Sequence, residues 1–330
     1  MPRPILPEPP DELKRLSDTL SSRIRGEIRR DGVIPFSRFM ERALYEPGLG
    51  YYSAGLHKLG ASGDFVTAPE LGGLFAACLA RQVAEVADEL GAFDILEVGA
   101  GTGRLAADLL CNLADGRLPE RYLILEVSPD LQERQASLLK SELPGLVDRV
   151  TWLETLPETH TGVIIANELL DALPVERFAK RAGSVTQLCV RSEDDTFDLT
   201  ERAAPETLAA AVAQIENDLG APLPEGYVSD VCLAAPAWIA DLAASLAQGM
   251  VLLFDYGVSR REYYSAERSG GWLRSHVRHH AHNDPLILPG IQDITSWVDF
   301  TGVAEAAVNA GLDISGYATQ AQFLIHGGLN

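Results

Sequence analysis

One ten-residue segment, Asp94-Ile-Leu-Glu-Val-Gly-Ala-Gly-Thr-Gly103, constrains the fold of this chain more than any other. An apolar run precedes Gly99, Gly101 and Gly103, and a helical pattern follows from Arg104. Glycines at this spacing let the backbone turn sharply, bring a ligand close to the main chain and pack the helix tightly on the strand. The segment therefore predicts a strand, a ligand-binding loop and a helix of an α/β fold.

Short apolar runs alternate with helical patterns over much of the chain. Five runs stand out, at 93–98, 122–127, 150–153, 163–166 and 250–254. Each is bounded by Gly, Asp, Glu or Asn, which is typical of a parallel sheet with crossover helices. We therefore predict a Rossmann-like α/β fold.

The N-terminal residues 1–60 are predicted to form a helical arm. Apolar side chains recur at three- and four-residue steps from Leu13 to Ile28, which indicates a helix from about Asp11 to Asp31. Ser37 is a candidate N-cap for a second, short helix.

The remaining chain is expected to divide into a core over 61–173, an insertion over 174–248 and a second part of the core, with a substrate loop, over 249–330. Alternating segments at 174–180 and 185–190 predict a hairpin in the insertion, followed by a helix over 205–219. We expect the insertion to form a lid or a small subdomain.

Composition limits the classes of function. Lys plus Arg number 27 against 47 Asp plus Glu, and the formal charge of −20 disfavours nucleic acid as a partner. The same excess suits solubility or a cationic substrate group such as arginine. The four cysteines form no CxxC pair, and the chain has no apolar run near the ~18 residues of a membrane span and no targeting signal. We expect a cytoplasmic protein without membrane insertion.

The glycine loop differs from that of a nicotinamide-binding protein. A dinucleotide fingerprint reads GxGxxG and places a pyrophosphate at the helix N-terminus, whereas here the third glycine comes one residue early. The acid Glu97 precedes the loop and would disfavour a diphosphate, but it could orient a methionine ammonium. Glu126 ends the second run, where an acid can accept both hydroxyls of a ribose, and Ser128 follows in a turn. S-adenosylmethionine is therefore favoured over a nicotinamide cofactor, and a solvated acid is the alternative for Glu126.

The fourth run opens into Asn167-Glu-Leu-Leu-Asp-Ala-Leu-Pro174 at the carboxyl edge of the predicted sheet, where open α/β folds bind ligands. Glu168 and Asp171 are three residues apart and would share a face if the segment is helical. Paired carboxylates suit a guanidinium, which they can grip in a bidentate manner. Helix-capping acids exposed to water are the alternative interpretation.

Two other segments carry polar clusters. Gly63, Thr67 and Glu70 lie in a loop before a helix predicted at 71–90, where capping is a sufficient explanation. Four histidines between His276 and His282 invite a metal interpretation, but they show no known ligand spacing, so we expect a substrate-facing loop and no metal site. GxSxG and Walker A patterns are absent from the sequence.

Five segments together resemble one family, the MidA-like methyltransferases, which includes a mitochondrial complex I assembly factor. They are Leu44-Tyr-Glu-Pro-Gly-Leu-Gly-Tyr-Tyr52, Gly63-Asp-Phe-Val-Thr-Ala-Pro-Glu70, Glu97-Val-Gly-Ala-Gly-Thr-Gly103, Asn167-Glu-Leu-Leu-Asp-Ala-Leu-Pro174 and Pro289-Gly-Ile-Gln-Asp-Ile-Thr295 with Val298-Asp-Phe300. The resemblance implies a class I S-adenosylmethionine-dependent methyltransferase with a mostly parallel, seven-stranded sheet. It implies that Gly63, Thr67, Glu70 and Asn167 join the cofactor site, and that arginine of a partner protein accepts the methyl group.

Rival functions remain open at this point. The acceptor could be a small molecule or another protein side chain. Alternatively, the chain could be an assembly chaperone that binds S-adenosylmethionine without turnover. A homodimer is expected from base rates alone.

Overall fold

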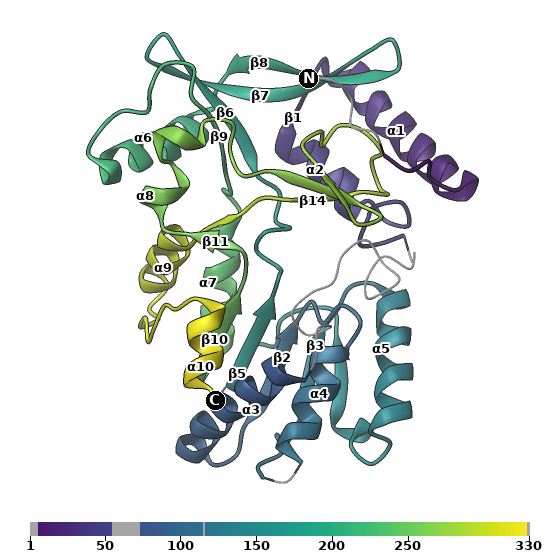
Figure 1. Ribbon diagram of the computed structural model, residues 1–330, viewed down its shortest axis with the longest axis vertical. Helices are drawn as coiled ribbons and strands as arrows, with labels where there is room; N and C mark the ends of the chain where they lie inside the picture. Colours follow the sequence, from purple (N-terminus) through teal and green to yellow (C-terminus); the bar gives the residue numbers. More distant parts are fainter. Residues whose placement is uncertain (1–5, 55–72, 115, 329–330) are drawn as a thin grey trace. The chain divides into compact units, whose positions relative to one another are not determined.

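The computed structural model describes residues 6–54, 73–114 and 116–328 (Figure 1). The chain forms two compact units. The parallel unit comprises His57–Leu169, Ala237–Asp255 and Ala306–Asn330, and the mixed unit comprises Met1–Leu56, Leu170–Pro236 and Tyr256–Glu305. The chain thus passes between units at positions other than 60, 173 and 248, because segments distant in sequence pack together in each unit.

The parallel unit contains a five-stranded sheet in the order β10-β5-β2-β3-β4, and all neighbouring strands are parallel. Its strands are β2 (Asp94–Val98), β3 (Tyr122–Leu125), β4 (Val150–Leu153), β5 (His160–Asn167) and β10 (Leu246–Phe254). The five apolar runs therefore predicted the strands correctly. The prediction of seven strands was wrong for the described residues, since after β10 the unit contributes no further apolar run that forms a strand.

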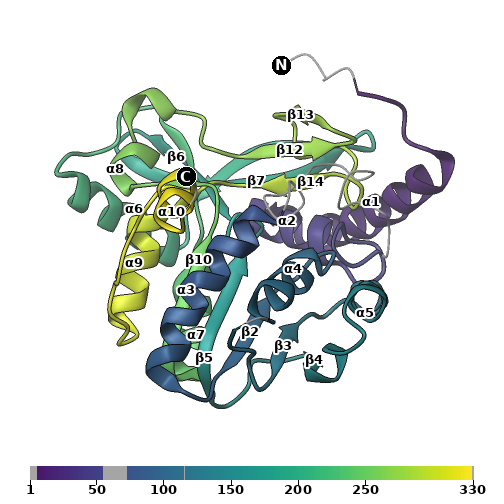
Figure 2. The ribbon, with the colours of Figure 1, turned by 60° about the horizontal axis from the view of Figure 1, so that its bottom comes forward.

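Helices cover both faces of this sheet (Figure 2). They are α3 (Leu74–Leu90), α4 (Arg104–Leu113), α5 (Pro129–Glu142) and α7 (Ala235–Ser245), with the C-terminal α10 (Gln320–His326) against α3. Ile95 of β2 packs in one core cluster with α3 and α4, whereas its neighbour Leu96 packs in another with Leu242 of α7. Alternate residues of a buried strand thus serve opposite faces.

The mixed unit begins with α1 (Asp11–Asp31), β1 (Ile34–Pro35) and α2 (Phe36–Tyr45). The predicted first helix is confirmed, and Gly32 closes it with a φ of 82°. The prediction that Ser37 caps the second helix was wrong. Pro35 occupies the N-cap position, and the hydroxyl of Ser37 instead donates a hydrogen bond to Glu176 Oε1 at 2.5 Å.

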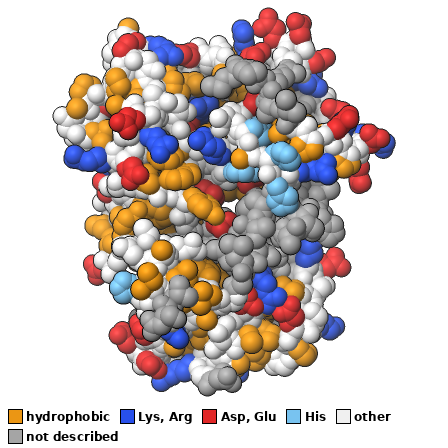
Figure 3. All heavy atoms as spheres, viewed as in Figure 1, with side chains coloured by type: hydrophobic (Ala, Val, Ile, Leu, Met, Phe, Trp, Pro, Cys, Tyr) orange, Lys and Arg blue, Asp and Glu red, His pale blue; other side chains and the backbone are white. Residues whose placement is uncertain are grey.

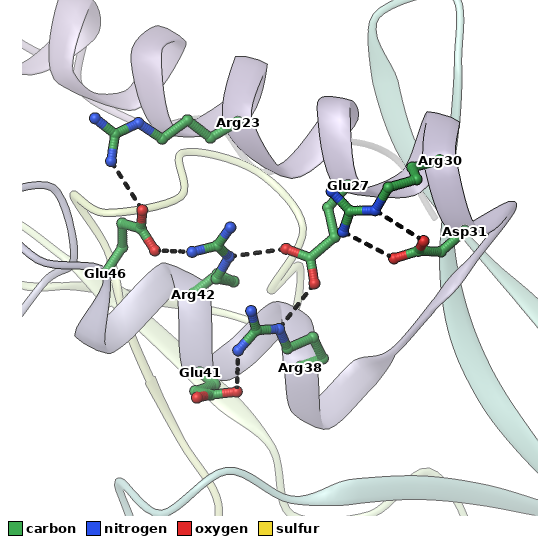
Figure 4. Close-up of polar contacts among 8 residues, drawn as sticks. All are labelled: Arg23, Glu27, Arg30, Asp31, Arg38, Glu41, Arg42 and Glu46. Carbon is green, nitrogen blue, oxygen red and sulfur yellow. Dashed lines mark hydrogen bonds and ion pairs between the residues drawn. The ribbon is translucent and has the colours of Figure 1, made fainter.

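An ion-pair network joins α1 to α2 (Figure 4). The buried Glu27 accepts hydrogen bonds from Arg38 Nε and Arg42 Nε, both at 2.9 Å. Arg42 also pairs with Glu46, which in turn pairs with Arg23 at 2.8 Å. The arginines thus neutralise the buried carboxylates of Glu27 and Glu46, which would be costly to bury without partners.

The predicted hairpin of the insertion is confirmed and belongs to an antiparallel sheet. That sheet has the order β1-β7-β6-β9, and β8 adds to β7. Its strands after β1 are β6 (Glu176–Arg181), β7 (Ser184–Glu193), β8 (Thr196–Ala203) and β9 (Val228–Val231), with α6 (Glu206–Leu219) as the predicted helix.

The rest of the mixed unit consists of short elements. They are β11 (Gly257–Val258), α8 (Arg260–Tyr263), β12 (Arg274–Val277), β13 (His280–His282), β14 (Asp293–Thr295) and β15 (Val298–Asp299), and α9 (Phe300–Asn309) follows. β11 pairs with β15 in parallel, and β12 pairs with both β13 and β14 in the antiparallel sense. The histidine segment is therefore a β-hairpin, and the expectation of a loop there was wrong.

No helix among the described residues is long and apolar enough to cross a membrane. On the face that Figure 3 shows, Lys and Arg side chains lie among Asp and Glu side chains without forming a broad basic field. This mixture agrees with the strongly negative formal charge of the chain.

Candidate active site

The predicted glycine loop connects β2 to α4 in the parallel unit. Gly99, Gly101 and Gly103 have φ angles of 70°, 53° and 83°, in the left-handed region that favours glycine. A Cβ atom on Gly99 would lie 2.7 Å from Leu169 Cδ1, and one on Gly103 would lie 3.1 Å from Gln135 Cγ. Both the backbone conformation and the close packing therefore require glycine at the loop.

The helix that follows the loop starts with Arg104, whose guanidinium is already engaged. Its NH2 nitrogen pairs with Asp108 at 2.6 Å and with Glu142 at 2.7 Å. A phosphate at the start of α4 would have to compete with these carboxylates. The surroundings of Arg104 therefore favour a cofactor without a diphosphate.

Glu97 lies inside the parallel unit rather than at its surface. Its side chain accepts a hydrogen bond from the hydroxyl of Tyr122 at 2.6 Å. Burial raises the pKa of Glu97 to about 7, against the opposing effect of the Tyr122 hydrogen bond. The carboxyl group with this raised pKa lies two residues before Gly99, the first glycine of the loop.

Glu126 follows the end of β3, as the sequence predicted, and is 7% exposed. Its Oε1 atom accepts the backbone N–H of Ser128 at 2.9 Å, and its Oε2 atom accepts Gln135 Nε2 at 3.3 Å. Burial raises the pKa of Glu126, and these two hydrogen bonds oppose that shift. Ser128 is the N-cap residue of α5, so its amide helps to hold the carboxylate in place.

Sequence reasoning missed Gln135, which connects the parts of this site. Gln135 is fully buried on α5. Its Nε2 atom donates to the carbonyl of Gly101 at 2.9 Å, and its Oε1 atom accepts the indole N–H of Trp152 at 2.8 Å. Its spacing could have indicated it, because Gln135 lies four residues before the apolar Leu139 and therefore on the same, buried face of α5.

Polar residues also gather where β5 and β10 end. Asn167 is the last residue of β5 and pairs with Phe254 of β10. Glu168 follows with a φ of 50°, and its backbone N–H donates to the carbonyl of Phe254 at 2.8 Å. Asp255, which sequence reasoning also missed, accepts the N–H of Leu169 at 3.1 Å. Adjacent parallel strands thus present Glu168 and Asp255 at the same sheet edge.

The helix proposed for Glu168 and Asp171 does not form. Residues 168–173 make bends and a turn, because the positive φ of Glu168 is incompatible with a right-handed helix. The boundary between units falls after Leu169, so Glu168 belongs to the parallel unit and Asp171 to the mixed unit. Asp171 is 7% exposed, and its carbonyl accepts the N–H of Ser296 at 2.9 Å.

Two tyrosines of the resemblance motif lie beside Asp171 within the mixed unit. Tyr45 donates its hydroxyl proton to the carbonyl of Ala172 at 2.8 Å, and Tyr52 donates to Asp293 Oδ1 at 2.9 Å. Their rings stack with centroids 5.6 Å apart. Burial raises the pKa of both hydroxyls, and the carboxylates of Asp293 and Asp171 add to the effect. Three motifs distant in sequence therefore meet in one hydrogen-bonded cluster.

The remaining predicted residues fall into two sets. Gly63, Thr67 and Glu70 lie outside the described residues. The histidines lie on the β12–β13 hairpin of the mixed unit, where His280 Nδ1 contacts the carbonyl of Arg278 at 2.7 Å. Within the described ranges, no group of three or more His, Cys, Asp or Glu side chains is arranged to hold a metal ion.

The parallel unit offers what S-adenosylmethionine requires. The glycine loop keeps its path beside Leu169 and Gln135 only while side chains are absent at Gly99 and Gly103. Glu126 is a buried acceptor whose described hydrogen-bond partners are neutral, so ribose hydroxyls suit it. A five-stranded parallel sheet with this loop after its central strand and an acid after the next strand fits the class of S-adenosylmethionine-dependent methyltransferases.

Comparison with known proteins supports this class and identifies the family. Residues 78–318 match the family model described as putative S-adenosyl-L-methionine-dependent methyltransferase. The chain belongs to this family, and its cofactor is S-adenosylmethionine.

Two relatives show how far the similarity extends. A likely methyltransferase from Burkholderia thailandensis, solved with bound S-adenosyl-homocysteine, is 44% identical, with a TM-score of 0.92 over 98% of this chain and 84% of that one. The mitochondrial protein arginine methyltransferase NDUFAF7 of Danio rerio is 26% identical over 96% of this chain and 78% of its own length. The first similarity confirms the methyltransferase fold.

Proposed function

We propose that this methyltransferase transfers a methyl group to an arginine side chain of a partner protein. The observation that carries the proposal is Asp171, a buried carboxylate whose turn is fixed by hydrogen bonds from Ser296 and Tyr45. A buried carboxylate on such a turn suits a planar guanidinium, because both of its oxygens can accept N–H groups. The mitochondrial relatives, which are named protein arginine methyltransferases, support the same acceptor.

The residues of each unit take separate parts in this proposal. In the parallel unit, Gly99, Gly101 and Gly103 hold the cofactor with Glu97, Glu126, Ser128 and Asn167, and the bound cofactor supplies a methyl group on a sulfonium. Gly63, Thr67 and Glu70 remain proposed members of that site. Glu126 accepts the ribose hydroxyls.

Glu168 in the parallel unit and Asp171 in the mixed unit are each proposed to accept N–H groups of an acceptor guanidinium and so to orient it for methyl transfer. Such positioning supplies much of the rate in a direct displacement. A bond from nitrogen to the methyl carbon would form as the bond from sulfur to that carbon breaks, S-adenosylhomocysteine would leave, and one of these carboxylates would receive the proton that the nitrogen loses.

Identification of the methylated product tests the acceptor. The purified protein is incubated with isotopically labelled S-adenosylmethionine and a protein extract, and the labelled protein is hydrolysed to amino acids. Methylarginine is the expected product. Label in another amino acid, or in small molecules, would show that the acceptor is wrong while the methyltransferase assignment stands.

A substitution separates turnover from binding. Glu168→Gln keeps the size of the side chain and removes its charge, so we expect turnover to fall by about 100-fold while S-adenosylmethionine binding changes little. Unchanged turnover in the variant would remove Glu168 from the proposed site, whereas wild-type protein that binds S-adenosylmethionine but methylates nothing would indicate the alternative of a chaperone without turnover. The cytoplasmic location and the homodimer stay predictions.

A further inference from the structure

Two exposed aromatic side chains stand at matching positions of a strand pair in the mixed unit. β11 and β15 pair in parallel, with Gly257 opposite Val298, and the N–H of Val298 donates to the carbonyl of Tyr256 at 2.8 Å. Tyr256 and Trp297 each come one residue before the paired positions. Tyr256 is 52% exposed and Trp297 is 36% exposed.

Trp297 stacks on Trp272, which is the buried ring of this group. Its ring lies 4.2 Å from that of Trp272, with an angle of 18° between the ring planes. Trp272 is 3% exposed, and its indole N–H donates to the carbonyl of Tyr263 at 2.9 Å. The guanidinium carbon of Arg268 lies 4.0 Å from the centre of the Trp272 ring. Two groups this close to one ring must occupy opposite faces, so the order is Arg268, Trp272, Trp297.

The negative charge of the protein favours a cation as the ligand that stacks on the exposed face of Trp297. The backbone N–H of Ser296, the residue before Trp297, donates to the backbone carbonyl of Asp171, whose side chain is a proposed partner of the guanidinium. The chain as a whole carries a formal charge of −20. Indole faces attract guanidinium groups through their negative π-face, and Trp272 already holds one such group, that of the exposed Arg268.

We propose that Tyr256 and Trp297 form a platform on which a guanidinium of the acceptor protein stacks against the outer face of Trp297. This inference rests on the proposed arginine methylation and adds a specificity-determining residue to it. A planar cation can cover the indole and still direct its edge N–H groups to carboxylates, which the ammonium of lysine cannot do in the same way. The platform would therefore favour arginine-containing acceptors over lysine-containing ones.

Indole resonances of the full chain provide the test. The sequence has four tryptophans, so an ¹⁵N-labelled sample gives four indole N–H signals, and Trp297→Phe identifies the signal of Trp297 by its loss. The sample is titrated with N-acetylarginine amide, and with N-acetylcitrulline amide as a planar but uncharged control. We expect the Trp297 signal to shift progressively with the arginine compound and not with the citrulline compound.

A pair of variants sharpens the result. Trp297→Ala is expected to weaken binding of N-acetylarginine amide by at least about threefold, whereas Tyr317→Ala removes a 65% exposed ring of the parallel unit and should leave binding unchanged. The proposal is overturned if the Trp297 signal does not shift with N-acetylarginine amide, or if it shifts equally with N-acetylcitrulline amide. Because the titration needs no turnover, it can fail while methylarginine is formed, or succeed while another product is found, so the two proposals are tested separately.

Discussion

The two units of this protein keep their polar residues in different ways. In the parallel unit, the core of the sheet is apolar, and polar side chains concentrate at the ends of β2, β3, β5 and β10. In the mixed unit, buried polar groups lie throughout: Glu27 joins α1 to α2, Arg177 pairs with Asp230 at 2.7 Å between β6 and β9, and Tyr52 reaches Asp293 across 241 positions of sequence.

The difference shows that polar residues serve different purposes in the two units. Parallel strands joined by crossover helices leave loops at one edge, and a ligand site can form there without disturbing the core. The mixed unit has ion pairs and hydrogen bonds between its elements, such as Arg177 with Asp230 and Tyr52 with Asp293, and these help to define its packing. We therefore expect cofactor binding to depend on the parallel unit and to tolerate polar substitutions in the mixed unit.

The largest expected effect concerns the glycine loop. Gly99→Val places a branched side chain at a φ of 70° and within 2.7 Å of Leu169, so S-adenosylmethionine affinity should fall by at least about 100-fold. Isothermal titration calorimetry measures this loss. Gly145→Val is the matched control, because a Cβ atom there meets nothing within 4 Å. Wild-type affinity in the Gly99 variant would remove the loop from the cofactor site.

The pH dependence of stability tests Glu97. Its folded-state pKa of about 7 lies above the ordinary value of 4.5, so the folded state retains a proton that the unfolded state releases between these pH values. The free energy of unfolding should therefore fall by roughly 3 kcal/mol as pH rises from 4.5 to 7, relative to Glu97→Gln. Denaturant titration at several pH values measures it, with the exposed Glu133→Gln as control. Parallel profiles for wild type and Glu97→Gln would contradict the buried environment of Glu97.

The sequence predicted these two regions unequally, for physical reasons. The strands and the glycine loop follow from local patterns, because each apolar run is buried on both faces and each glycine meets a local backbone requirement. Gln135, Asp255 and the Tyr52–Asp293 bond depend on contacts across many residues, and no local period indicates them. The prediction of a helix around Asp171 was wrong because the spacing of residues alone does not show that Glu168 adopts a positive φ.

Removal of Gln135 should affect both binding and stability. Gln135→Leu leaves the carbonyl of Gly101 and the indole N–H of Trp152 without their buried partner, so we expect a loss of about 2 kcal/mol in the free energy of unfolding. S-adenosylmethionine affinity should fall with it, since Gln135 supports Glu126. Denaturant titration and calorimetry measure the two effects. Gln214→Leu, on the exposed side of α6, is the control, and equal stability of the two variants would exclude a connecting role for Gln135.

A substitution in the mixed unit sharpens the comparison. Tyr52→Phe removes the hydroxyl that donates to the buried carboxylate of Asp293, at an expected cost of about 1 kcal/mol. Thermal unfolding measures the loss, with the exposed Tyr317→Phe as control. S-adenosylmethionine affinity should stay within about twofold of wild type, because the proposed cofactor residues belong to the other unit. A large loss of affinity would contradict the separate roles of the two units.

The smallest expected effect concerns Glu27, whose contribution to stability should depend on pH in the opposite direction to that of Glu97. Burial raises the pKa of Glu27, but the hydrogen bonds and charges of Arg38 and Arg42 outweigh it, so the net pKa is lowered. The contribution of Glu27 to stability is therefore present above its ordinary value of 4.5 and is lost as pH falls through the lower folded-state pKa. Glu27→Gln should be less stable than wild type at pH 7, and the difference should narrow in acid.

Denaturant titration at pH 7 and in acid measures that difference. Glu41→Gln, at the exposed end of the same network, is the control and should change stability by less than about 0.5 kcal/mol. A difference between Glu27→Gln and wild type that grew in acid would show that burial, rather than the two arginines, dominates at Glu27. The mixed unit would then resemble the parallel unit in how it holds a buried carboxylate.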